Sequence, residues 1–576
     1  EVNRFAFTGG NKVYTGEKCD RVFNNKGANE IKGKLTYDYK YRLLFDSRDV
    51  KYVNATKRHI KVGIPRILNM YEEYPFWDAL LHAAGFDVIL SSDSTFSQYE
   101  GALNTVMSDN ICFPAKLAHS HLKELNENQE VDRILMPYVV YEHNDDPKNT
   151  LNSFNCPVVS GYSDVIKSVI DLKKPIDSPV INFAQSKALE KQIVDYLKKL
   201  GVDRKTARKA LREALYAQAA YSAEIKTKAW EILNQNEEKP RLTILLAGRP
   251  YHTDPLVQHK LSEMIANLGV NVISEDIARG SSDNNDAYNS QPETYLVKQW
   301  AYMNRIMKAA QWASEQGNNV HFVQMTSFGC GPDSFIQDEI RDIMRRHNKP
   351  FTLLKIDDVS NIGSLKLRVR SLIESLKGQA SHQTQCSKLN AQRLEQTKVF
   401  TKQDVHRKIL APFMTEYLTP IIPPILKLIG YDVEVLPMSD EASAEIGLRF
   451  ANNEVCYPAT LIVGDIIKAL KSGKYDLKST AVVMSQTGGQ CRATNYAGLI
   501  KRAMISNGFQ DVPLLTLGVT ASTGEASGST DDKQDYNEQD GFNVPWLKYS
   551  QIIVTAIFYG DAINEMYNAC IARERK

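Results

Sequence analysis

The chain has 576 residues, of which 43% are hydrophobic and 24% charged, so it is a globular chain too long for a single hydrophobic core. Its 70 basic and 68 acidic side chains leave a formal charge of +2, which favours neither nucleic acid nor a membrane surface as a partner. No apolar run reaches membrane-spanning length and the polar start is no secretory signal, so we expect a cytoplasmic protein, and Glu1 in place of Met indicates a piece of a longer chain.

The first part of the chain reads as a polar leader, an α/β unit and a helical segment. Residues 1–58 are rich in Lys, Asn and Tyr, which favours an irregular or β-rich leader. Residues 59–184 alternate apolar strands with helices and predict a first Rossmann-like domain. Residues 185–238 predict a helical connector, broken at Gly201 and restarted behind the capping residue Asp203. The strands expected in the first domain are Ile60–Ile64, Asp87–Leu90 and Arg133–Val140.

Two further α/β units follow. Residues 239–378 predict a second Rossmann-like domain, 379–400 a polar linker and 401–576 a third domain, which includes an acidic insert near 525–541 and a closing helix. Because strands alternate with helices, the sheets should be parallel with right-handed crossovers. The expected fold class is α/β, with three Rossmann-like or flavodoxin-like domains and a ligand site beyond the carboxyl ends of the strands, between domains.

A short glycine-led segment repeats in the three units, followed by cysteines at matching distances. The segments begin at Gly85, Gly269 and Gly430, and each opens the second strand of its unit. Such repetition indicates that the fold places these cysteines. The offsets are 61 residues both from Gly269 to Cys330 and from Gly430 to Cys491, and 27 and 26 residues from Gly85 to Cys112 and from Gly430 to Cys456.

Two of the cysteines, Cys112 and Cys456, each open a helix in a Cys-aromatic-Pro-Ala motif. Proline in the first helical turn puts each sulfur at a helix N-terminus, where the helix dipole favours the thiolate that ligates metal. The alternative is that both are small buried hydrophobic residues.

The other candidate ligands are Cys330 and Cys491, which are flanked by glycines, and Cys156, which precedes a proline. Gly329, Gly331 and Gly489 would let backbone N–H groups approach an inorganic cluster, although tight strand-to-helix turns would need the same glycines. No Cys-x-x-Cys pair occurs, which argues against a zinc ribbon.

Three further residues are weaker candidates for cofactor binding. Lys116 follows Cys112 by one helical turn and could neutralise an anion or a thiolate. Arg249 and His252 lie in GRPYHTDP after a strand and suit either a ligand loop or a structural ion pair. Neither a P-loop nor a GxGxxG motif is present, so no familiar phosphate loop is expected.

Several of these segments together resemble a known family, the 2-hydroxyacyl-CoA dehydratase activase-related proteins. These are large relatives of 2-hydroxyglutaryl-CoA dehydratase subunits and of double-cubane cluster proteins. The resemblance covers nearly the whole chain. The segments that carry it are IKVGIPRILNMYEEYPFW, SDNICFPAK, NCPVVSGY, GRPYHTDP, TSFGCGPD, KIDDVSN, NNEVCYPA and SQTGGQCRATNY.

The resemblance implies an iron–sulfur cluster, either 4Fe-4S or an 8Fe-9S double cubane, held by Cys112, Cys156, Cys330, Cys456 and Cys491. It implies electrons of low potential from an ATP-hydrolysing activator of the acetate kinase and heat-shock chaperone type, and a small substrate. The chain departs from the family where it has Tyr138 in place of a further cysteine, and no activator domain is visible in it.

The leading hypothesis is therefore an iron–sulfur reductase component, with 2-hydroxyacyl-CoA and its radical dehydration as one candidate reaction. A non-enzymatic electron carrier or scaffold and a cluster-free α/β protein remain as alternatives. A homodimer is an open option, and the roles of Cys19, Cys386 and Cys570 stay open.

Overall fold

The computed structural model describes eleven ranges of the chain, and Cys19, Cys386 and most of the acidic insert lie outside them. The described residues are 3–6, 12–15, 32–45, 57–234, 241–280, 292–358, 362–380, 394–417, 419–517, 541–542 and 545–573.

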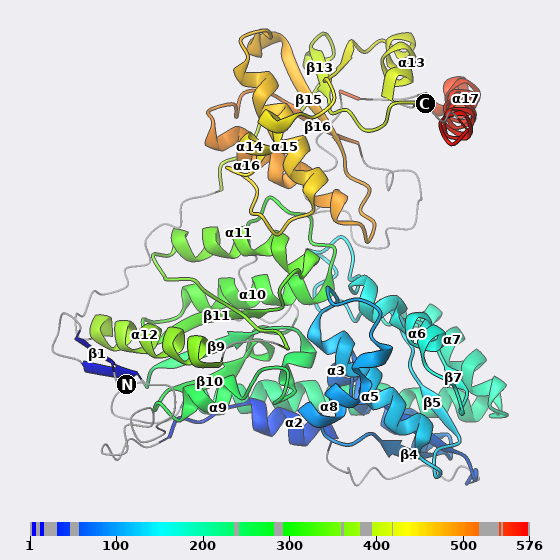
Figure 1. Ribbon diagram of the computed structural model, residues 1–576, viewed down its shortest axis with the longest axis vertical. Helices are drawn as coiled ribbons and strands as arrows, with labels where there is room; N and C mark the ends of the chain where they lie inside the picture. Colours follow the sequence, from blue (N-terminus) through cyan, green and yellow to red (C-terminus); the bar gives the residue numbers. More distant parts are fainter. Residues whose placement is uncertain are drawn as a thin grey trace.

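Three four-stranded sheets organise the structure, and every strand pair in them is parallel (Figure 1). Each four-stranded sheet has the same order when its own strands are numbered along the chain: the second strand pairs with the first, the first with the third and the third with the fourth. The predicted α/β fold class with parallel sheets is thereby confirmed.

Unit I contains the first sheet, with order β4-β3-β5-β7. Its elements are β3 (Lys61–Ile64), α3 (Met70–Ala83), β4 (Asp87–Leu90), α4 (Phe96–Ala102), η1 (Leu103–Thr105), α5 (Phe113–Glu127), β5 (Arg133–Leu135), β6 (Tyr138–Tyr141), α6 (Pro157–Val169), β7 (Ile176–Asp177) and β8 (Val180–Asn182).

Unit II contains the second sheet, with order β10-β9-β11-β12. Its elements are β9 (Thr243–Ala247), η2 (Pro250–Thr253), α9 (Leu261–Ala266), β10 (Asn271–Ser274), η3 (Glu275–Ala278), α10 (Ala301–Glu315), β11 (Val320–Thr326), α11 (Gly331–Arg346), β12 (Thr352–Lys355) and α12 (Ile362–Ala380).

Unit III contains the third sheet, with order β14-β13-β15-β16. Its elements are η4 (Lys402–Asp404), β13 (Lys408–Ala411), η5 (Thr419–Ile421), α13 (Ile422–Ile429), β14 (Val433–Val435), α14 (Glu441–Gly447), α15 (Tyr457–Lys471), η6 (Leu477–Ser479), β15 (Thr480–Ser485), η7 (Arg492–Asn495), α16 (Tyr496–Ser506), β16 (Leu514–Leu517) and α17 (Trp546–Ile571).

A helical pair, α7 (Ser186–Lys199) and α8 (Arg204–Leu233), lies between units I and II, as the sequence indicates. Asp203 caps α8 by accepting hydrogen bonds from the backbone N–H groups of Lys205 and Thr206. The leader contributes the antiparallel strands β1 (Asn3–Ala6) and β2 (Lys12–Thr15) and also an unexpected helix, α2 (Tyr37–Phe45). This helix is anchored by buried Lys40, whose Nζ lies 2.6 Å from Asp276 Oδ2 of unit II.

The repeated glycines serve one backbone purpose in all three units. Gly85, Gly269 and Gly430 have φ values of 91°, 80° and 106°, in the left-handed region where glycine has no Cβ penalty. Each ends the helix that precedes the second strand of its unit. The sequence repeat is therefore a repeated helix stop.

One predicted strand was wrong. Residues 133–140 form two strands, β5 and β6, which belong to different sheets, since β6 pairs with β8. Pro137 lies between them, and proline has no N–H to donate to a ladder. The break lets the chain leave the main sheet of unit I.

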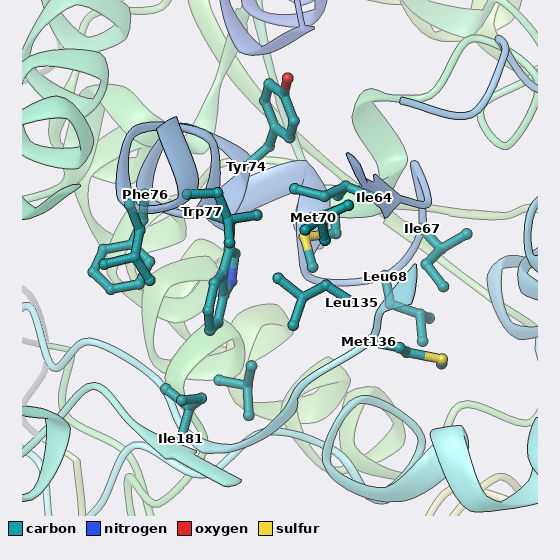
Figure 2. Close-up of a cluster of buried hydrophobic side chains, with 14 of the residues drawn as sticks. Ile64, Ile67, Leu68, Met70, Tyr74, Phe76, Trp77, Leu135, Met136 and Ile181 are labelled. Atoms are coloured by element: carbon teal, nitrogen blue, oxygen red, sulfur yellow. The ribbon is translucent and has the colours of Figure 1, made fainter. Parts of the chain in front are cut away.

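The core of unit I packs α3 against the sheet (Figure 2). Trp77 and Phe76 are fully buried, and Ile64 and Leu135 come from neighbouring strands. A second cluster joins units II and III, because it contains Trp300 of unit II together with side chains of α15 and α16. The two units therefore share apolar packing.

Candidate functional site at the helix N-termini

Five cysteines occupy the same local position, the residue that caps the N-terminus of a helix. None of the five side chains makes a capping hydrogen bond, so each sulfur remains available to another partner. In open parallel sheets these helix starts lie beyond the carboxyl ends of the strands, where ligands bind. The five are Cys112 of α5, Cys156 of α6, Cys330 of α11, Cys456 of α15 and Cys491 of η7.

The positions are equivalent between the units, which the sequence offsets only partly indicated. Cys112 and Cys456 start the helix that leads into the third strand, and the corresponding position in unit II is Trp300 of α10. Cys156, whose offset is the least regular, starts the helix after the third strand, as Cys330 and Cys491 do in their units. Counting elements rather than residues would have found this equivalence.

Cys112, Cys156 and Cys330 form one group where units I and II meet. Burial raises the pKa of Cys112 to about 11, and the neighbouring Cys156 adds to the shift. Burial likewise raises the pKa of Cys330 well above its ordinary value. At Cys112, burial therefore opposes the thiolate that a helix N-terminus favours. A coordinated cation reverses that balance, since it binds the deprotonated sulfur.

Cys456 and Cys491 form a second group in unit III. Cys456 Sγ lies 2.8 Å from the hydroxyl oxygen of Tyr496, at the start of α16. Burial raises the pKa of Tyr496 well above its ordinary value, and the hydrogen bond to Cys456 adds to the shift, so this hydroxyl remains a hydrogen-bond donor at neutral pH. Cys491 is exposed, whereas the other four cysteines are partly buried.

Hydrogen bonds tie the two groups together through the residues next to the cysteines. Gln490 Nε2 donates to Asn155 O at 2.6 Å and to Ser160 Oγ at 3.0 Å, which joins the Cys491 loop to the Cys156 loop. Gln299 Nε2 donates to Cys491 O at 3.2 Å, and Trp300 Nε1 donates to Gln490 O at 3.3 Å. All three units thus contribute to one set of connected loops.

Arg249 is the buried charge at the centre of the first group. Its side chain is 2% exposed, with Nη2 2.8 Å from Asp333 Oδ1 and 3.1 Å from Cys330 Sγ. Burial alone would lower the pKa of Arg249, but Asp333 and Cys330 hold it well above its ordinary value. Asp333 is fixed in turn by Thr326, whose hydroxyl donates to Oδ2 at 2.8 Å. Arg249 is therefore a charged donor directed at a candidate ligand.

His252 supports Arg249 from the same turn. Its Nδ1 accepts a hydrogen bond from Arg249 N at 2.9 Å, so a neutral ring carries its proton on Nε2. That buried Nε2 has no hydrogen-bond partner among the described residues. Burial lowers the pKa of His252 to about 4, so the ring is neutral at pH 7.

The depressed pKa of His252 predicts that the protein loses stability in mild acid. The unfolded chain takes up a proton near pH 6.5 while the folded ring does not, so the free energy of unfolding falls as the pH drops from about 6.5 toward 4. We expect this residue to contribute a loss of about 2 kcal/mol between pH 7 and pH 5. Urea unfolding at several pH values measures the slope. In His252→Asn, whose amide oxygen can accept the same hydrogen bond, the slope should be smaller, and an equal slope would contradict the assignment.

The three glycines predicted to contact a cofactor lie in different structural environments. Gly329 has φ 67° and open space where a Cβ would stand. A Cβ on Gly331 would overlap the guanidinium of Arg492, so Gly331 admits the neighbour of Cys491 beside Cys330. Gly489 has open surroundings apart from Thr487 at 3.6 Å, and cofactor contact at these glycines stays a prediction.

Lys116 is engaged in an ion pair between units. Its Nζ lies 2.9 Å from Asp358 Oδ2 in unit II, and the Tyr99 hydroxyl donates to the same oxygen at 2.5 Å. The ammonium group of Lys116 thus neutralises Asp358 and links units I and II, and its predicted neutralisation of a bound anion stays a prediction.

Tyr138 stands where the resembled family often has a cysteine. Its hydroxyl donates to Asp164, which lies two helical turns beyond Cys156 on α6. The ring also lies under Lys167 Nζ at 5.5 Å. Tyr138 is thus held along the flank of α6 rather than at its N-terminus.

The five candidate ligands are all sulfur donors. Within the described ranges, no three His, Cys, Asp or Glu side chains lie close enough together to hold one metal ion. Hydrogen bonds from Gln490 connect the loops of Cys156 and Cys491, and thiolates are the usual ligands of iron–sulfur clusters. Buried Arg249 beside Cys330 suits the negative charge of such ligands.

Comparison with known families gives a match for part of this chain. Residues 61–278, from β3 to η3, match the model of the CoA enzyme activase uncharacterised domain. The matched region contains Cys112, Cys156, Arg249 and His252, whereas the other three candidate ligands lie beyond it. No curated protein matches the chain. Residues 61–278 therefore relate this chain to the CoA enzyme activase family.

Proposed function

We propose that this chain is an iron–sulfur component of a CoA-linked reducing system. It would receive low-potential electrons from an ATP-hydrolysing activator and reduce a small substrate, with 2-hydroxyacyl-CoA thioesters as the leading class. The observation that carries the proposal is the placement of five cysteines at equivalent helix N-termini of three parallel-sheet units. The relation to CoA enzyme activases supports a dehydratase-type enzyme as the partner.

The chain's own residues would hold and tune the group. Cys112, Cys156, Cys330, Cys456 and Cys491 would supply the thiolates, in the 4Fe-4S or the 8Fe-9S form. Arg249 would donate to the sulfur of Cys330, which lowers the charge density on that ligand. Tyr496 would do the same for Cys456. When bound, an iron–sulfur cluster supplies one-electron reduction at low potential.

Iron and acid-labile sulfide, measured per chain on protein purified without oxygen, test the proposal. We expect about eight irons for a double cubane or about four for a single cubane. Cys330→Ala should lose most of the iron, because it removes the candidate ligand that accepts a hydrogen bond from the buried guanidinium of Arg249. An iron-free parent protein would contradict the proposal.

Cys570→Ala is the matched control, because Cys570 is exposed on α17 and belongs to neither cysteine group. It should keep the iron content of the parent. If iron is bound but no acyl-CoA thioester perturbs the absorption or electron paramagnetic resonance spectrum of the reduced protein, the electron carrier is favoured over the reductase.

A further inference from the structure

The last described helix, α17, is largely exposed. In Figure 1 it lies beside α13 and apart from the three sheets. Monomeric globular proteins rarely expose a continuous apolar surface of this extent. The large apolar side chains of α17 that are at least 36% exposed are Ile552, Val554, Ile557, Phe558, Tyr559, Ile563, Met566, Tyr567 and Ile571.

Among the described residues, α17 contacts the rest of unit III through a hydrogen bond and a pair of aromatic rings. The Tyr549 hydroxyl donates to Leu428 O of α13 at 3.2 Å, and the Tyr567 ring lies 5.3 Å from the ring of Tyr417. Gly560 is buried, whereas its neighbour Tyr559 is 65% exposed. One edge of the helix thus touches unit III, and its apolar face remains uncovered.

Part of this exposed surface follows the spacing of a helix that pairs with another helix, since Ile552, Tyr559, Ile563 and Met566 lie on one seam and Tyr567 lies beside it. Seven residues alternate at steps of three and four along α17, which are the a and d positions of a coiled-coil heptad. Acidic and amide side chains fall outside this seam and its flanks, at Asp561, Asn564, Glu565 and Asn568. The seam residues are Tyr549, Ile552, Ala556, Tyr559, Ile563, Met566 and Cys570.

The seam is complementary to itself when two copies run antiparallel. A two-fold axis between Ala556 and Tyr559 places each of these residues opposite the other, so the smallest seam residue meets a large ring. The same axis places Ile552 opposite Ile563. Every such contact occurs twice, as an isologous interface requires. The acidic residues stay on the outer side, so the two copies do not oppose like charges.

From this self-complementarity we propose that α17 pairs antiparallel with α17 of a second copy of this chain. The seam from Tyr549 to Cys570 is about 33 Å long. A contact stripe about 10 Å wide gives roughly 330 Å² per copy, against about 800 Å² in a standard interface. The dimer should therefore be reversible and depend on protein concentration. This proposal does not rest on the iron–sulfur function.

Light scattering on the full chain during gel filtration tests the dimer. The expected mass rises with loading concentration from 64.9 kDa toward twice that value. Met566→Asp, in the seam, should return the protein to monomer, whereas Phe558→Asp should leave the dimer intact. These two side chains are matched, since each is 69% exposed and only Met566 lies in the seam. Because both side chains are exposed, neither change should alter the melting temperature at concentrations where the parent chain is monomeric.

Cross-linking tests the orientation. In a Cys570→Ser background, a mixture of Ile552→Cys and Ile563→Cys chains should form mixed disulfides on mild oxidation, because the antiparallel seam brings those positions together. A parallel pair would link Ile563→Cys chains to each other and would overturn the orientation. A monomer at every concentration would overturn the proposal. A dimer that withstands Met566→Asp would overturn it as well, and so would a monomer whose seam binds an activator or lipid vesicles.

Discussion

Replacing Arg249 by methionine is expected to lower the free energy of unfolding by about 3–5 kcal/mol. The change removes the guanidinium that lies 2.8 Å from Asp333 Oδ1, and Asp333 is only 1% exposed. A carboxylate left at that depth has lost its counter-charge and cannot recover water. Urea unfolding at pH 7 measures the effect.

The second half of the ion pair supplies the control. Arg249→Met combined with Asp333→Asn removes both charges, and the asparagine can still accept the hydrogen bond from Thr326. We expect the double variant to recover more than half of the loss, because no unpaired charge then remains. A single variant that costs less than about 1 kcal/mol would contradict the burial of this pair.

Placing alanine at Gly464 is expected to separate two helices in unit III and destabilise the protein by at least about 3 kcal/mol. A Cβ on Gly464 of α15 would overlap the backbone oxygen of Ser443 in α14. Gly447 of α14 has the reciprocal contact, since its Cβ would overlap the backbone oxygen of Thr460. Backbone atoms on both sides leave no flexible side chain to yield, so the helices must move apart.

The consequence should reach the candidate site, because α14 and α15 are joined by the loop that ends at Cys456. That loop also contacts unit II, where Asn452 Nδ2 donates to Ser334 O at 2.8 Å. Thermal unfolding followed by circular dichroism measures the loss in Gly464→Ala. Gly473→Ala isolates the steric effect, because nothing lies within 4 Å of its Cβ and its own cost is the strain of φ 71°. A Gly464→Ala protein as stable as the parent would contradict the close helix crossing.

Much of the fold was predictable from local pattern. The Cys-aromatic-Pro-Ala motifs predicted helix starts at Cys112 and Cys456, because proline is tolerated in the first turn. Asp203 predicted the start of α8 from its capping chemistry. The prediction of one strand across Pro137 was wrong, because it followed the apolar pattern and overlooked that proline has no backbone N–H to donate to a sheet. Helix α2 was missed because it depends on burial against unit II, through Lys40 and Asp276.

The candidate site was predictable as a list of cysteines but not as an arrangement. The repeat offsets named Cys330 and Cys491, and neither offset nor composition indicated that Trp300 takes the sixth equivalent position. The motif around Arg249 suited either a structural ion pair or a ligand-binding loop. In the structure one nitrogen of Arg249 forms the ion pair with Asp333 and also donates to the candidate ligand Cys330. The ion pair of Lys116 could not be predicted from the sequence, because its partner Asp358 lies 242 residues further along the chain.

The sequence by itself determined the strand-helix alternation, the glycine helix stops and the placement of cysteines before helix starts. Those features depend on φ preferences and hydrogen bonds between residues a few positions apart, which are written locally in the chain. Only the tertiary structure decided that Cys156 lies near Cys112, why the pKa of Cys112 rises to about 11, and that α17 is largely exposed. Burial and charge depend on neighbours that are distant in sequence, and no local pattern specifies them.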